Sequence, residues 1–290
     1  MTNPVVQRFF HEPTNTFSYV VRDPASSAAA VIDPVLDYDH RSGRTETQFP
    51  DQIVAYVLEN ELEIHWILET HAHADHLTSA PYLKEKLGGK IAIGEGIREV
   101  QRTFKSIFNF KDLNTDGAQF DHLFVNDETF EIGGLKGRVL HTPGHTSDSV
   151  SYVIGNAAFV GDTLFAPDYG TARTDFPGGD ARTLYRSIHR IFDLPKDTRV
   201  FLCHDYMPGG RPVEHEHSLL DHQKNNMHIR EAVLEDDFVR LRETRDASLA
   251  MPDLIIPSVQ VNIRAGEFPP AEDNGVAYLK VPLNQFGRGR

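Results

Sequence analysis

The chain has 290 residues, of which 40% are hydrophobic and 24% are charged, a composition typical of a folded globular protein. Its formal net charge of -13 argues against nucleic acid as a partner, because such a surface repels phosphate backbones. The single cysteine, Cys203, excludes an intramolecular disulfide and a CxxC metal site. No stretch reaches the roughly 20 apolar residues of a membrane span, and no signal peptide is recognisable. We therefore expect a cytoplasmic protein that does not bind membranes.

The first two-thirds of the chain carries short apolar or alternating runs bounded by turn residues, which predict strands. Apolar residues at three- and four-residue spacing predict one helix around Ile53–Leu58 and another around Leu184–Ile191. Asp180 is the expected N-cap of the second helix, and Pro195 lies just past its end. The predicted strands are Val5–Phe10, Phe17–Val21, Ala28–Ile32, Ile64–Leu68, Lys90–Ile93, Gly137–His141, Ser149–Ile154, Ala157–Val160 and Val200–Leu202.

This mixture of adjacent strands and interspersed helices predicts a layered α/β (α+β) protein rather than a doubly wound dinucleotide-binding fold. The polar segment Asp37–Pro50 is expected to be a long surface loop. Residues 213–247, which are dense in charge and histidine, predict helix on a solvated face, and the proline-containing tail Pro252–Arg290 predicts extended structure. We expect residues 1–290 to form a single domain, with 213–290 a helical and extended C-terminal part packed on it.

Four candidate metal ligands lie within the six-residue segment His71-Ala72-His73-Ala74-Asp75-His76. The segment follows the predicted strand Ile64–Leu68, so it is expected to be a loop at the end of that strand. Buried imidazoles and carboxylates need partners, which makes simple core packing a poor explanation for all four. Imidazole together with carboxylate suits zinc, iron or manganese.

Three further motifs also place a candidate ligand at the end of a predicted strand. They are Thr142-Pro143-Gly144-His145, Gly161-Asp162-Thr163 and Cys203-His204-Asp205. Each motif alone could be structural, because Gly-Asp is a common turn and a single histidine after a strand usually has a protein partner. In this order, however, the four motifs resemble those of the metallo-β-lactamase superfamily. The resemblance covers roughly the first 210 residues and implies a four-layer αβ/βα sandwich with the metal site at one edge of the sheets.

The superfamily resemblance leaves the reaction open, because its members include hydrolases and an oxygenase. Most hydrolytic members bind two metals, one at positions matching His71, His73 and His145 and the other at positions matching Asp75, His76 and His204, with Asp162 bridging. All seven residues are present here. A glyoxalase II-like hydroxyacylglutathione hydrolase with a dinuclear site is therefore the alternative reading of this chain.

The segment Thr171–Gly179 favours a different reaction, because it resembles the GRTDFxxG stretch of persulfide dioxygenases, also called sulfur dioxygenases. The segments Phe9–Pro13, Thr183–Ile188, Ile191–Pro195 and His204-Asp205-Tyr206 are also similar to that family. One departure is that Thr171 and Ala172 stand where close relatives often carry Cys-Gly.

The persulfide dioxygenase resemblance implies one Fe(II) per chain, bound by His71, His145 and Asp162, whereas zinc belongs to the alternative. Two histidines and one carboxylate leave coordination positions free for dioxygen and for the substrate sulfur. On this reading, the remaining candidates hydrogen-bond the ligands or bound water and fix ligand orientation. These residues are His73, Asp75, His76 and His204.

The substrates that the resemblance implies are glutathione persulfide and O2, with sulfite and glutathione as products. We expect Arg173 to bind a glutathione carboxylate, since guanidinium pairs with carboxylate through two parallel hydrogen bonds. Tyr206 and Thr146 match positions that contact glutathione in the family. An ion pair with Asp175 or Asp180 is the structural alternative for Arg173. A homodimer is the expected assembly, because such symmetric dimers are the commonest oligomers.

Overall fold

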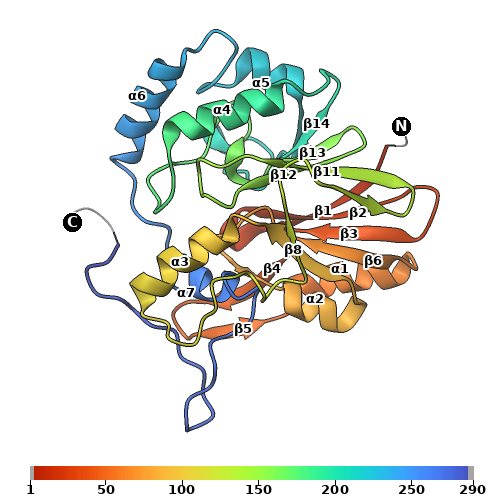
Figure 1. Ribbon diagram of the computed structural model, residues 1–290. Coiled ribbons are helices and arrows are strands. Elements are labelled where there is room, and N and C mark those ends of the chain that lie inside the picture. The colour runs from red at the N-terminus through yellow and green to blue at the C-terminus, as the bar shows by residue number, and fades with distance from the viewer. Residues whose placement is uncertain (1–2, 287–290) are drawn as a thin grey trace.

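The computed structural model describes residues 3–286 and contains two six-stranded sheets packed face to face (Figure 1). The first sheet has the order β1-β2-β3-β6-β8-β9, antiparallel over its first three strands and parallel from β3 to β9. Its strands are β1 (Val5–His11), β2 (Thr16–Arg22), β3 (Ala28–Ile32), β6 (Glu63–Leu68), β8 (Lys90–Gly94) and β9 (His122–Phe124).

The second sheet runs β10-β11-β12-β13-β14-β15, and its only parallel pair within residues 3–286 is β13 with β14. A small third sheet, β5-β4-β7, lies at the rim of the first. The strands of the second sheet are β10 (Thr129–Ile132), β11 (Leu135–His141), β12 (Val150–Ile154), β13 (Ala157–Phe159), β14 (Arg199–Phe201) and β15 (Glu216–Ser218), and those of the third are β4 (Val35–Asp39), β5 (Arg44–Glu46) and β7 (Leu77–Thr78).

Helices cover the outer face of each large sheet, which completes the predicted four-layer αβ/βα sandwich (Figure 1). Alternation along the strands supplies both interfaces: in β3, Val31 packs against the helices and Ile32 packs between the sheets. Helices α1 (Gln48–Glu59), α2 (Ala80–Leu87), α3 (Ile97–Phe108) and α7 (Ile255–Asn262) pack on the side of the first sheet, and α4 (Ala181–Phe192), α5 (Leu219–Asn225) and α6 (Glu235–Asp246) on the side of the second.

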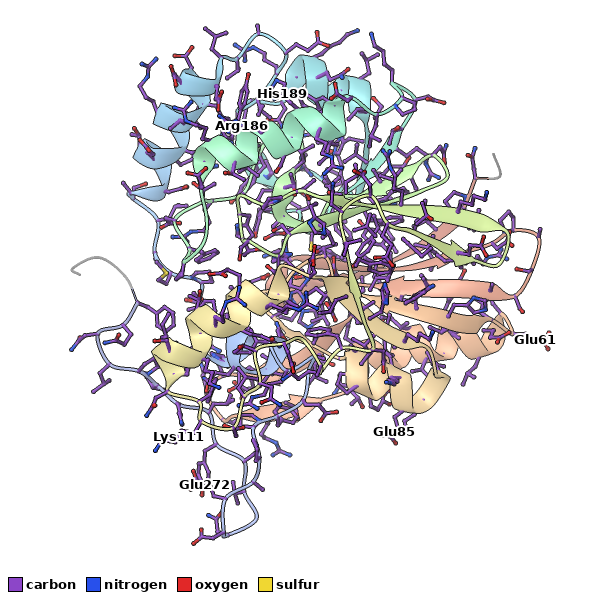
Figure 2. All side chains as sticks on the ribbon, in the orientation of Figure 1. Glu61, Glu85, Lys111, Arg186, His189 and Glu272 are labelled. Atoms are coloured by element: carbon purple, nitrogen blue, oxygen red, sulfur yellow. The ribbon has the colours of Figure 1, made fainter. Side chains whose placement is uncertain are left out.

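The two helices predicted from apolar spacing are confirmed. In α1, Ile53 and Val57 are buried at a four-residue spacing, although Leu58 is 64% exposed. In α4, the Asp180 carboxylate accepts a hydrogen bond from the backbone N–H of Thr183, as an N-cap does. Charged side chains such as Glu61, Glu85 and Arg186 extend from the periphery of the molecule (Figure 2).

Two expectations about irregular segments are wrong for the same reason. Asp37–Pro50 is not a long loop, because it holds most of β4, all of β5 and the start of α1. The tail after Pro252 is not wholly extended, because it contains α7. Pro50 and Pro257 both lie in the first turn of their helices, where a backbone N–H has no partner within the helix and proline is tolerated.

The charged region 213–247 is also more buried than expected. It contains β15 at the sheet edge as well as α5 and α6, and His222 is fully buried rather than solvated. No helix in residues 3–286 is both long enough and apolar enough to cross a membrane. The predicted domain 1–290 and the predicted extended tail Pro252–Arg290 include residues 1, 2 and 287–290, which lie outside the described residues.

Candidate metal centre

The seven candidate ligands lie on four segments that begin where strands end. Four of them occupy the loop between β6 and β7, His145 lies between β11 and β12, Asp162 lies in a short 3-10 turn after β13, and His204 follows β14. All are buried except Asp75, which is half-buried. The strand-end placement expected from the sequence is thus what the structure shows, and it brings residues up to 133 positions apart (71 to 204) to one place.

His71, His145 and Asp162 form one donor group, with one donor atom of each residue lying within 4.8 Å of the others. The Asp162 Oδ2 atom is 3.6 Å from His145 Nε2 and 4.0 Å from His71 Nε2. Two donors bound to one ion at about 2.1 Å lie at most about 4.2 Å apart, so these separations fit ligands of a shared metal. The three residues that the sequence predicted as ligands are therefore brought together.

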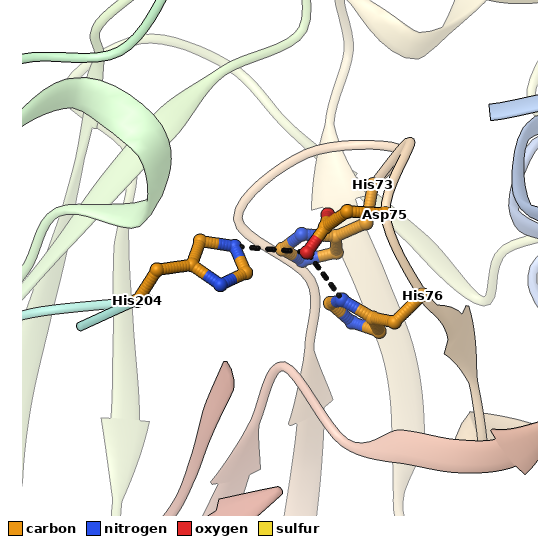
Figure 3. A group of neighbouring side chains, drawn as sticks. All are labelled: His73, Asp75, His76 and His204. Atoms are coloured by element: carbon orange, nitrogen blue, oxygen red, sulfur yellow. Dashed lines mark ion pairs between the residues drawn. The ribbon is translucent and has the colours of Figure 1, made fainter. Parts of the chain in front are cut away.

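His73, Asp75, His76 and His204 form a second group beside the first. Asp75 lies between the rings of His76 and His204, with its Oδ2 atom 3.6 Å from His76 Nδ1 and 3.3 Å from His204 Nε2 (Figure 3). His204 Nε2 is also 3.2 Å from Asp162 Oδ1. Asp162 thus directs one oxygen to each group, as a carboxylate between two metal sites would.

Unpaired buried atoms indicate that these groups are built for a ligand outside the protein. His71 Nε2, His73 Nδ1 and His76 Nε2 are buried without a hydrogen-bond partner, and His204 Nε2 and Asp162 Oδ1 lie close to each other without forming a hydrogen bond. Leaving such atoms unpaired costs about 1–3 kcal/mol each, so a cluster of them is unfavourable unless something binds there. Imidazole nitrogen and carboxylate oxygen are donors that iron and zinc accept, and the residues present therefore fit a metal ion.

A network behind the donors fixes their orientation. The Asp33 carboxylate accepts hydrogen bonds from the backbone N–H and the hydroxyl of Thr70 and lies 3.0 Å from His73 Nε2. That contact leaves the Nδ1 atom of His73 to face the donors. His145 Nδ1 lies 2.8 Å from the carbonyl oxygen of Arg173, to which it can donate, so that its Nε2 atom is the one left for a metal.

The fold and the strand-end donors agree with a match over residues 11–204 to the family model described as the metallo-beta-lactamase superfamily. The chain belongs to that superfamily. A probable metallo-hydrolase of Burkholderia pseudomallei is 52% identical over 290 residues, with 96% of this chain and 99% of that protein covered. Glyoxylase B2 of Dictyostelium discoideum is 50% identical over 272 residues, with 93% of both chains covered.

Persulfide dioxygenases are more distant relatives within the metallo-beta-lactamase superfamily. Human mitochondrial persulfide dioxygenase ETHE1 is 31% identical over 207 residues, with 70% of this chain and 69% of that protein covered. The crystal structure of ETHE1 from Myxococcus xanthus superposes with a TM-score of 0.72 at 28% identity, covering 91% of this chain and all of that one. The predicted superfamily and its sandwich fold are confirmed, as is the resemblance to persulfide dioxygenases.

Burial and neighbouring charges shift the pKa values of the donor groups in opposite directions. Burial, helped by the charge of His73, holds the pKa of His71 well below its usual range, which favours the neutral ring that a metal binds. Burial alone would lower the pKa values of His73 and His204, but the negative charges of the neighbouring carboxylates raise them by more. Asp33 raises the pKa of His73 to about 9, and Asp162 and Asp75 raise that of His204 to about 10.

A cavity of about 560 Å3 opens onto the donors. Asp75, His76, His145 and Asp162 line its inner end, and aromatic side chains line much of the rest, as is common for the ligand pockets of enzymes. The aromatic residues are Tyr38, Phe165, Tyr169, Phe176 and Tyr206. The segment resembling persulfide dioxygenases contributes Thr171, Ala172, Arg173 and Phe176 to the same wall.

The three predicted substrate contacts have different surroundings. Tyr206 lines the cavity and stacks on Tyr169 with ring centroids 4.6 Å apart. Arg173 also lines it, but its guanidinium pairs with both oxygens of Asp175, at 2.6 and 2.8 Å, which is the structural alternative raised by the sequence. Thr146 is not among the described residues that line the cavity. Its hydroxyl oxygen lies 2.6 Å from the hydroxyl oxygen of Ser149.

Sequence reasoning missed the residues that hold the donor loops from a distance. Buried Glu69 accepts a hydrogen bond from the Thr78 hydroxyl, and Asp148 accepts one from the backbone N–H of Ala72 at 2.8 Å. Asp246 of α6 accepts hydrogen bonds from the backbone N–H and the hydroxyl of Thr174. Glu69 and Asp148 each lie beside an apolar run and Asp246 lies in a charged helix, and neither setting identifies the partner of the carboxylate.

Proposed function

We propose that this protein is an iron-dependent persulfide dioxygenase that oxidises glutathione persulfide. The observation that carries the proposal is the buried group of His71, His145 and Asp162 beside the segment Thr171–Gly179. Two imidazoles and one carboxylate are the ligand set of many non-haem Fe(II) oxygenases. The similarity to ETHE1 over 70% of the chain supports the same reaction class.

The proposed reaction converts glutathione persulfide, O2 and water into glutathione and sulfite with release of two protons. The S–S bond breaks, the outer sulfur is oxidised to the +4 state, and dioxygen is reduced by four electrons. Iron held by His71, His145 and Asp162 would supply the redox chemistry of dioxygen activation, which protein side chains do not provide.

The chain's own residues bind and orient the reactants. The carbonyl of Arg173 fixes the ring of His145 through Nδ1, so the segment Thr171–Gly179 couples the pocket wall to a ligand. Phe165 and Phe176 are buried in that wall and keep water from the inner end of the cavity. On the other side of Asp162, the His204 ring lies between two carboxylates, with its Nε2 atom 3.2 Å from Asp162 Oδ1 and 3.3 Å from Asp75 Oδ2.

One specific observation favours a second function, that of a dinuclear metallo-hydrolase acting on hydroxyacylglutathione. Asp162 directs Oδ2 towards the first donor group and Oδ1 towards His204, which is the position of a bridging ligand. Two relatives about half identical to this chain are named a probable metallo-hydrolase and glyoxylase B2. The two functions differ in metal content and in the need for oxygen.

Metal analysis joined to an oxygen-electrode assay separates the two functions. Protein isolated without added metal should contain about one iron per chain and consume O2 when glutathione persulfide is added. The variant Asp162→Ala should lose both the iron and the oxygen uptake, whereas Asp193→Ala, which removes an exposed carboxylate at the end of α4, should keep both. Two zinc ions per chain with cleavage of a glutathione thioester and no oxygen uptake would replace this proposal by the hydrolase.

A further inference from the structure

The C-terminal part of the chain builds one side of the cavity. The family match ends at residue 204, yet α6 and the segment after it line the cavity through Arg242, Arg245 and five residues between Leu249 and Leu254. In Figure 1, α6 packs beside α4, and the chain then runs down towards α7. This wall therefore lies outside residues 11–204, which match the superfamily model, and we expect differences in substrate selectivity between members to lie there.

Three arginines line this cavity, and the guanidinium groups of two of them form ion pairs and hydrogen bonds within the protein. The Arg173 guanidinium pairs with Asp175, donates to the carbonyl of Ala250 at 2.6 Å and lies 4.9 Å from the centre of the Phe176 ring. The Arg242 guanidinium is buried, pairs with Asp246 and donates to the carbonyl of Thr171 at 2.8 Å. Both side chains therefore build the wall.

Arg245 differs from both, because its side chain makes no ion pair or hydrogen bond with any of residues 3–286. Two carboxylates of the lining, Asp75 and Asp162, belong to the donor groups, and no ion pair joins Arg245 to the third, Asp253. A guanidinium left unpaired at a cavity wall of a chain with a formal net charge of -13 is available to an anionic ligand.

An aromatic path connects the donor groups with Arg245. Phe165 lies 6.0 Å from the ring of His204 and 5.8 Å from that of Tyr206, and Tyr206 stacks on Tyr169 at 4.6 Å. Tyr169 and Arg245 line the same cavity, and the charges of Arg245 and Arg242 act against the rise in the pKa of the Tyr169 phenol that burial causes. A ligand with its sulfur at the donors would lie along these rings with its far end near Arg245.

We propose that Arg245 is the carboxylate-binding residue of this cavity and recognises the anionic end of a small thiol persulfide. The inference rests on the proposed function for the identity of the sulfur group. Guanidinium binds carboxylate through two parallel charge-assisted hydrogen bonds, and Arg245 can do so without breaking a contact within the protein. Arg173, the residue favoured by the sequence, holds the wall in place.

The test compares glutathione with an analogue that lacks the free glycine carboxylate and with one that lacks the whole γ-glutamyl group, including its carboxylate. Glutathione, its glycine monoethyl ester and cysteinylglycine are titrated into metal-loaded protein by calorimetry, for the wild type and for Arg245→Gln, Arg245→Lys and Arg240→Gln. Arg240 lies on the same helix and is exposed, as Arg245 is, but its guanidinium is paired with Asp237 and does not line the cavity, so it is the matched control. We expect Arg245→Gln to weaken glutathione binding about 10-fold or more, Arg245→Lys less, and Arg240→Gln not at all.

A thermodynamic cycle that combines the Arg245 variant with the ligand analogues tests whether Arg245 binds a carboxylate. In the wild type, removal of one carboxylate, by the ester or by loss of the γ-glutamyl group, should weaken binding, and in Arg245→Gln the same removal should have no further effect. Additive effects for both analogues overturn the inference. Unchanged iron content and melting temperature in Arg245→Gln are also expected, because the Arg245 side chain makes no ion pair or hydrogen bond within residues 3–286 whose loss would destabilise the fold.

Kinetics keep this inference separate from the proposed reaction. If the protein consumes O2 with glutathione persulfide, Arg245→Gln should raise KM about 10-fold with little change in kcat. Oxygen uptake with unchanged KM would overturn the role of Arg245 and leave the dioxygenase proposal intact. Carboxylate-dependent binding without oxygen uptake would support the Arg245 site and overturn the dioxygenase.

Discussion

The side-chain amide of Asn262 donates to the backbone carbonyl oxygens of His73 and His76, each at 2.8 Å. Its Oδ1 atom accepts a hydrogen bond from the backbone N–H of Thr78 at 2.9 Å. Asn262 is buried at the end of α7, so a helix near the C-terminus holds the loop that carries four of the seven candidate ligands. Ile255 and Val259 of α7 also pack in the core beneath the first sheet. We propose on this basis that the C-terminal part belongs to the same domain as the donor loops.

The first prediction is that Asn262→Ala lowers the affinity of the site for metal. The substitution leaves two buried carbonyl groups and one buried N–H unpaired, so the loop relaxes and the donors of His73 and His76 move. We expect the metal dissociation constant, measured by competition with a chelator, to rise about 10–100-fold. The matched control for this variant is Gln260→Ala. Gln260 lies on the same helix, but among residues 3–286 its amide hydrogen-bonds only to Ile256 and Lys280. Equal metal affinity in the two variants would contradict the assigned role.

A second prediction concerns the buried pair of Arg242 and Asp246. Asp246 also accepts two hydrogen bonds from Thr174, beside the residue whose carbonyl orients His145. Replacing Asp246 by Ala leaves a buried guanidinium without its anion, and we expect a loss of about 3–5 kcal/mol in the free energy of unfolding. Urea unfolding measures this directly.

The double variant Arg242→Met with Asp246→Ala should be less destabilised than the sum of the two single variants, since it removes the uncompensated charge. The exposed pair of Asp237 and Arg240 on the same helix provides the comparison. Asp237→Ala should cost less than about 1 kcal/mol, as exposed ion pairs do. A similar cost for both aspartates would mean that burial of the first pair has no energetic consequence.

The strands and the donor positions were predictable from the sequence because both are local features. The apolar run Ile64–Leu68, followed closely by His71, predicts that a strand ends and a polar loop begins there. His145 and Asp162 follow apolar runs in the same way. The contacts of Asn262 were not predictable, because its partners lie 184 to 189 positions away. Nor was the pairing of Arg173 decided, since Asp175 and Asp180 were both near in sequence and only the fold selects Asp175.

A third prediction tests the close approach behind the Thr142–His145 turn. Gly144 has a φ of +134°, and a Cβ atom there would lie 2.4 Å from the backbone N and Cα atoms of Leu184 in α4. Backbone atoms of a helix cannot move away as a flexible side chain can, so Gly144→Ala should displace the turn and the adjacent His145. We expect a loss of several kcal/mol in stability together with weaker metal binding, measured by denaturant titration and chelator competition.

Gly43 separates backbone strain from this steric clash. Its φ is +68°, but a Cβ atom there would meet nothing within 4 Å. Gly43→Ala should therefore cost only about 1 kcal/mol, the penalty for a left-handed backbone with a side chain, and should leave metal affinity unchanged. If Gly144→Ala behaved like Gly43→Ala, the contact with Leu184 would not be what positions His145.

The last prediction follows from His228, which lies behind the segment Thr171–Gly179. Its Nδ1 atom accepts a hydrogen bond from the backbone N–H of Thr171 at 3.0 Å, so the folded protein requires the neutral ring. Burial, helped by the charges of Arg242 and Arg245, lowers the pKa of His228 from 6.5 to about 4. The unfolded chain then binds a proton more readily than the folded one. The neutral His228 ring therefore makes its full contribution to the free energy of unfolding above pH 6.5. As the pH falls from 6.5 towards 4, that contribution decreases by about 3 kcal/mol.

This loss is measured as the change with pH in the difference between the unfolding free energies of the wild type and His228→Asn, so that the titration of other groups cancels. At pH 7 the wild type should be the more stable protein, and the difference should shrink as the pH approaches 4, because the asparagine variant has no ring to protonate. A difference that stays constant with pH for His228→Asn would show that the ring is not held neutral, and that the hydrogen bond from Thr171 does not set its protonation state.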